Sequence, residues 1–172
     1  LLIFRFMNII IQSSIHTLSK SKQLLCSLSN EDLSNHSVSP YYSCIGSHIR
    51  HILDFYDCII DGIDNTTIDL TKRKREERMH TDCNYTLSHV ERIIDKLKRF
   101  DNYSFTKHYV VSDDLGIGKV DIMYTLGAVL AQANSHAIHH YAIISYILDR
   151  LEIPMKDESF GYNPTTPRQI VN

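Results

Sequence analysis

Residues 124–151 read YTLGAVLAQANSHAIHHYAIISYILDRL and form a long helix-like run near the end of the chain. Its apolar residues recur at steps of three and four, which is the spacing of one face of an α-helix. The members of this stripe are Leu126, Val129, Leu130, Ala133, Ala137, Ile144, Ile147 and Leu151. Pro154 lies just beyond the run and marks its end. The sequence therefore predicts a long final helix with one face buried against other helices.

Two histidines fall within this buried stripe. His136 and His140 are four residues apart, so on a helix they lie one above the other and direct their imidazoles the same way. Burying two imidazoles costs free energy unless their nitrogens find partners, and a divalent cation satisfies both at once. The other interpretation is a pair of core histidines that form hydrogen bonds with carbonyls or tyrosine hydroxyls. The spacing alone does not separate the two.

A second histidine stretch, His48-Ile49-Arg50-His51, lies in another helix-like run and offers a third ligand. At roughly 100° per residue, His48 falls within the apolar stripe of that helix and His51 falls at its edge. The periodicity slightly favours His48, whereas a site with an open coordination position favours the edge residue His51. From the residues alone, both stay open.

The rest of the chain indicates three more helices, a hairpin and an irregular tail. We expect helices from Met7 to just before Ser29, from near Ser43 to Gly62, and from Thr81 or Asp82 to Phe100. β-branched residues on both sides of the Asp- and Gly-rich break at 113–118 predict a short hairpin within residues 105–123. Residues 160–167 are rich in turn formers and are expected to pack across the bundle as extended chain.

Several charged side chains near the second helix are expected to be solvated. Residues 63–82 form the polar stretch of the chain, and we expect it to be a connector. Its arginines Arg73, Arg75 and Arg78 have the chemistry to hold a substrate carboxylate, but exposure to solvent is the simpler expectation. On the helical wheel, Asp54 and Asp57 lie on the polar side of the second helix, away from a metal site.

Composition bounds the class of protein. With 172 residues, 43% hydrophobic and 22% charged, the chain fits a single domain spanning 1–172 with a substantial core. Met7 is a candidate start, which would make residues 1–6 an upstream extension. The net charge of −2 argues against a nucleic-acid partner, and the apolar opening run is too short to enter a membrane as a span. The four cysteines show no CxxC pair, so we expect free thiols and a cytoplasmic location.

The motifs resemble those of the DinB superfamily, which comprises DinB and YfiT-like metal-dependent proteins. The resemblance is carried by GSHIRHILD at 46–54, SHAIHHYA at 135–142, Phe160-Gly161 and Thr166-Pro167-Arg168. It implies an all-α fold, an up-down-down-up four-helix bundle with the hairpin before the last helix. It also implies His51, His136 and His140 as metal ligands, because an aliphatic residue follows His51 and an acidic one lies three residues on. His48 and His139 are then alternate ligands or neighbours of the ligands.

The resemblance also bears on function. Three imidazoles leave at least one coordination position open, as in catalytic centres, and the family includes thiol transferases. We expect a metal-dependent hydrolase or thiol S-transferase that uses zinc or nickel and a small thiol or ester substrate. The alternative is a non-catalytic, homodimeric bundle in which metal serves stability or sensing. No nucleophile or general base is identifiable near the histidines, so the sequence assigns no catalytic residue.

Overall fold

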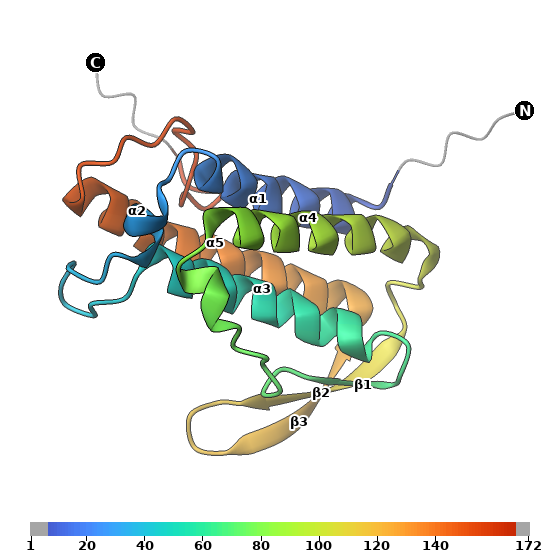
Figure 1. Cartoon of the computed structure of the whole chain (residues 1–172). Coiled ribbons are helices and arrows are strands. Elements are labelled where there is room, and N and C mark those ends of the chain that lie inside the picture. Colours follow the sequence, from blue (N-terminus) through green and yellow to red (C-terminus); the bar gives the residue numbers. More distant parts are fainter. Residues whose placement is uncertain (1–6, 168–172) are drawn as a thin grey trace, which may run out of the picture.

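The computed structural model describes residues 7–167 as a bundle of long helices beside a small sheet (Figure 1). The long helices are α1 (Ile9–Leu25), α3 (Ile45–Gly62), α4 (Cys83–Arg99) and α5 (Leu126–Arg150). Shorter helical elements are α2 (Asn30–Ser34) and the 3₁₀ turns η1 (Glu77–His80) and η2 (Phe100–Asn102). All four long helices were predicted, with bounds shifted by a few residues. The suggested extension at residues 1–6 and Arg168 of the tail motif lie outside the described residues.

The directions of the helices follow from contacts between their ends. The backbone N–H of Asn8, just before α1, donates to Asp101 after α4, so these two helices are antiparallel. Gly127 at the start of α5 lies close to Ile10 at the start of α1, and Tyr141 further along α5 forms a hydrogen bond with Ser21 near the end of α1, so these two helices are parallel.

Helix α3 runs with α4, because Gly46 at the start of α3 lies close to His80 just before α4, and the end regions meet where Tyr103 donates to Asp64. Helix α3 runs against α5, because its earlier His48 packs on the later His140 and its later Phe55 packs on the earlier His136. The long helices thus run up, down, down and up in chain order (Figure 1).

Side-chain caps fix where the long helices begin. The Thr125 hydroxyl accepts a hydrogen bond from the backbone N–H of Ala128. Thr125 is therefore the N-cap residue of α5, which begins at Leu126. Asp82 caps α4 in the same way, through the N–H of Tyr85. Both caps occupy donors that would otherwise be unpaired at a helix start. The long helices therefore begin close to the positions that the sequence predicts.

The sheet makes the all-α expectation too narrow. Strands β1 (Thr67–Asp69), β2 (His108–Asp114) and β3 (Lys119–Thr125) form one sheet in the order β1-β2-β3. The predicted hairpin is present as the antiparallel pair β2 and β3, with Val110 opposite Met123. The parallel strand β1 lies in the expected connector and was missed. It pairs with residues about forty positions away, so the local sequence carries no signal for it.

The core runs between the helices and continues beneath the sheet. Ile52, Val90 and Val129 are fully buried between helices, and Ile68 and Val111 are fully buried under the sheet. Within residues 7–167, every helix is too short or too polar to span a lipid bilayer. The sheet thus shares the core of the helical bundle and packs against the end of α3.

The C-terminal tail packs on α5 and α1, but it does so through turns rather than as extended chain. The Phe160 ring stacks on Tyr141 at a centroid distance of 4.6 Å. Lys20 of α1 donates to the hydroxyl of Ser159 at 2.6 Å. Gly161 has φ of 81°, and a Cβ there would lie 2.6 Å from Ser145 Oγ, so the tail passes too close to α5 for a side chain. These contacts occupy the face of α5 toward α1 and leave another face to α3.

Candidate metal centre

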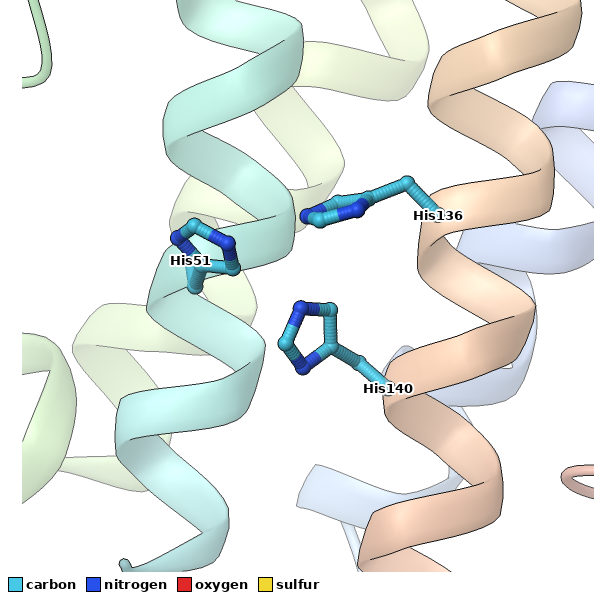
Figure 2. A group of neighbouring side chains, drawn as sticks. All are labelled: His51, His136 and His140. Atoms are coloured by element: carbon cyan, nitrogen blue, oxygen red, sulfur yellow. The ribbon is translucent and has the colours of Figure 1, made fainter. Parts of the chain in front are cut away.

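Helices α3 and α5 lie side by side in antiparallel directions and bring three histidines together. Figure 2 shows His51 of α3 facing His136 and His140 of α5 across the space between the helices. One nitrogen from each of the three rings lies within 4.8 Å of the others. The ring centroids are 4.8 Å apart for His51 and His136, and 4.6 Å for His136 and His140. We call these residues the three-histidine cluster.

His48 lies beside this cluster rather than in it. Its Nδ1 is 2.9 Å from Nδ1 of His140, and its Nε2 is 2.7 Å from the hydroxyl of Ser43. Hydrogens can be assigned so that His140 Nδ1–H donates to His48 Nδ1, and His48 Nε2–H donates to Ser43. This assignment leaves the lone pair on His140 Nε2. An outer partner of this kind usually holds a metal-binding imidazole in the correct tautomer.

His136 carries the clearest mark of a missing partner. Its Nε2 is buried and has no hydrogen-bond partner among the described residues. The ring packs against Phe55 at a centroid distance of 5.1 Å, which fixes its orientation. A core histidine satisfied by a carbonyl or a tyrosine hydroxyl would have this nitrogen paired. The orphaned nitrogen and the neighbouring imidazoles therefore fit a divalent cation better than they fit a satisfied core.

The imidazoles of the cluster are neutral, which is the state that binds metal. Burial lowers the pKa of His51 to about 3, with the positive charge of Arg73 adding to the effect. Burial, together with the other histidines, lowers the pKa of His140 to about 2. Burial also lowers the pKa of His136. Each of the three rings is therefore uncharged at neutral pH and carries one ring nitrogen with a lone pair.

His139 does not belong to the cluster. It is exposed on α5, and its ring centroid lies 5.3 Å from that of His140. Its place one residue before His140 turns it about 100° around the helix, toward solvent. No described hydrogen bond links it to the other histidines. It serves as a surface residue of the same helix and a natural control for experiments on its neighbours.

Arg73 was expected in solvent, but it is half-buried at the edge of the cluster. Its Nη1 donates to Nδ1 of His51 at 3.1 Å, and its Nε donates to the carbonyl of Leu70 at 3.1 Å. Nothing in the local sequence distinguishes Arg73 from Arg75 or from the other basic residues of that run. The distinction comes from β1, which ends just before this segment and directs it back over α3.

The expectation that Asp54 and Asp57 are solvated is wrong. Both carboxylates are buried, and both are paired. Asp54 accepts a hydrogen bond from Arg50 at 2.7 Å, and Asp57 accepts one from His89 of α4 at 2.6 Å. The wheel correctly separates them from the three-histidine cluster, but it cannot show that α4 and the η1 segment cover that side of α3. They are structural ion pairs rather than ligands.

No protein-family model matches this chain, and no curated protein matches it in sequence. What the structure establishes is a mainly helical protein with four long helices and a cluster of three histidines that can hold a metal ion. The resemblance to the DinB superfamily stays an expectation drawn from the sequence motifs.

Proposed function

We propose that the protein is a DinB-like, divalent-metal-binding protein with His51, His136 and His140 as ligands. The observation that carries this proposal is the approach of one nitrogen from each ring to within 4.8 Å of the others. The unpaired Nε2 of His136 supports it, because a buried polar atom without a partner costs free energy that a cation would recover.

We further propose that the bound ion takes part in catalysis on a small thiol or ester, as in a hydrolase or thiol S-transferase. Three imidazoles leave coordination positions open, and imidazole ligands suit zinc and nickel. Such an ion supplies Lewis acidity and lowers the pKa of a group bound in an open position. The role of the chain is to orient the ligands: His48 holds the His140 ring, and Phe55 holds the His136 ring.

The first test is metal content after purification without a histidine tag. The wild-type protein and the variants His51→Ala, His136→Ala and His140→Ala are compared by elemental analysis. His139→Ala is the matched control, because it removes an exposed histidine from the same helix. We expect about one equivalent of metal in the wild type and the control, and large losses in the three variants. Equal metal content in all five proteins would refute the proposal.

The cluster also joins α3 to α5, and this favours a second candidate function, a non-catalytic, homodimeric bundle in which the metal serves stability or sensing. Chelation separates the two functions. If removal of the ion lowers the melting temperature and the loaded protein turns over none of a panel of thiols and esters, the non-catalytic function holds. Metal-dependent turnover of any member of the panel supports the enzyme.

A further inference from the structure

Arg73 is the one charged side chain that donates directly to a residue of the three-histidine cluster within residues 7–167. Other arginines near α3 are neutralised, as Arg50 is by Asp54 and Arg92 is by Asp57. Arg73 forms no salt bridge with a carboxylate of the described chain; its partners are the His51 ring and the Leu70 carbonyl. A half-buried guanidinium thus lies beside the cluster with no carboxylate paired directly to it among the described residues, although the buried Asp54 acts on it at longer range.

The hydrogen bond between Arg73 and His51 excludes a metal ion from His51. A guanidinium only donates, so Nδ1 of His51 must carry the lone pair that accepts this bond. In a neutral imidazole the other nitrogen, Nε2, then carries the hydrogen. Neither nitrogen is left with a free lone pair. An ion can bind His51 only if it takes Nδ1 itself or if the proton moves to Nδ1, and both events break the bond to Arg73.

We propose that Arg73 is displaced from His51 when metal binds and then holds the anionic group of the substrate, a carboxylate, beside the open coordination position. This inference rests on the proposed metal site. In the metal-free protein, Arg73 forms its hydrogen bond with Nδ1 of His51. In the metal-loaded protein, it favours ligands that carry a carboxylate.

The position of the side chain suits both roles. The hydrogen bond from Nε to Leu70 anchors the guanidinium near the cluster, independently of His51. Once Nη1 leaves His51, both terminal nitrogens can turn toward the cluster, and a planar guanidinium binds a carboxylate through two parallel hydrogen bonds. A free guanidinium beside a bound cation is also repelled unless an anion lies between them. A carboxylate on the open side of the metal relieves that repulsion.

The test uses Co²⁺, whose visible absorption reports its ligands, and acetate as the carboxylate probe. Titrations of Co²⁺ are compared for the full-length wild type, Arg73→Leu and Arg75→Leu. Arg75 is exposed, and among the described residues no hydrogen bond joins its side chain to a histidine, so its variant controls for the loss of one positive charge. Acetate is then added to each Co²⁺-loaded protein, and circular dichroism checks that each variant is folded.

The two roles of Arg73 predict opposite effects of one substitution. Arg73→Leu should bind Co²⁺ about tenfold more tightly than the wild type, since a hydrogen bond to a charged group no longer has to be broken. The same variant should bind acetate about tenfold more weakly. Arg75→Leu should match the wild type in both titrations.

The outcomes separate this inference from the proposed function. If the wild type fails to bind Co²⁺, the metal site itself is refuted. If the wild type binds Co²⁺ and Arg73→Leu binds it no more tightly, the metal site stands and the role of Arg73 is refuted. Equal acetate affinity in the two loaded proteins also overturns the role of Arg73.

Discussion

Replacing His136 with leucine should stabilise the metal-free protein and remove the stabilisation that metal gives. The Nε2 atom of His136 is buried and unpaired, and such an atom costs about 1–3 kcal/mol. Leucine is similar in size, packs against Phe55, and carries no polar atom. Since the His136 residue is only partly buried, we expect the lower end of that range. A gain of about 1 kcal/mol raises the melting temperature of a chain this long by roughly 2–4 °C.

The same substitution should have the opposite effect when metal is present. An ion at 100 times its dissociation constant stabilises the folded protein by about 2.7 kcal/mol. Removing one of three ligands weakens binding enough that this term largely disappears in the variant. The wild type should therefore be less stable than the variant in chelator and more stable than the variant in metal. The free energies of unfolding of the two proteins should differ by about 1–2 kcal/mol in each condition, with opposite sign.

Urea unfolding, monitored by circular dichroism in the presence of chelator and in the presence of Zn²⁺, measures both effects. His139→Leu is the matched control, because it places the same residue at an exposed position of α5 and should shift with metal as the wild type does. The reasoning fails if His136→Leu destabilises the metal-free protein, since Nε2 must then have a partner. It fails equally if the variant keeps the full metal-dependent gain.

Three further substitutions test the surroundings of the site. Asp57→Asn should destabilise the protein by about 2 kcal/mol at neutral pH, because it breaks a buried pair with His89. Burial alone raises the pKa of Asp57, but the hydrogen bond and the positive charge of His89 lower this pKa overall. The stability that ionised Asp57 supplies is therefore fully present above about pH 4, the pKa of an unfolded aspartate, and is lost as the pH falls through the lower pKa of the folded state. Urea unfolding should show the difference from the wild type shrinking in that range, and a constant difference would contradict the assignment. Gly46→Ala should cost about 1–3 kcal/mol, because a Cβ there would lie 2.7 Å from the backbone Cα of His80; a gain in melting temperature, the usual result of this change in a helix, would show that the contact is absent. Tyr141→Phe removes a buried hydroxyl that forms two hydrogen bonds with α1, and it should lower stability by about 1 kcal/mol, whereas the same change at an exposed tyrosine should have no effect.

The elements that the sequence predicted well are those whose signal is local. The long helices follow from apolar residues at steps of three and four, and their starts follow from capping residues such as Asp82 and Thr125. The hairpin follows from β-branched residues around the break at 113–118. The inward direction of His136 and His140 follows from the wheel of α5 alone. Each of these inferences uses only residues within a single helix or hairpin.

The features that the sequence did not predict depend on pairing between distant segments. Strand β1 exists because Ile68 pairs with Val111 and is buried under the sheet. That pairing brings Arg73 over α3, which turns one member of a basic run into a neighbour of His51. Asp54 is buried because the segment around Arg75, 21 residues further along the chain, covers it, and the wheel of α3 alone carries no signal for that segment.

The choice between His48 and His51 shows the same limit within a single site. A helical wheel gives the angle of a side chain around its own helix, and by angle His48 is the more buried of the two. Ligation also depends on level along the axis, and three residues amount to about 4.5 Å of rise. In the antiparallel pair, His48 lies level with His140, Phe55 lies level with His136, and His51 falls between them, near both rings. The third position is therefore set by the register of α3 against α5. The close contact of Gly46 with the backbone of η1 helps to fix this level, so a side chain at position 46 can shift His51 relative to α5 without altering any of the three residues.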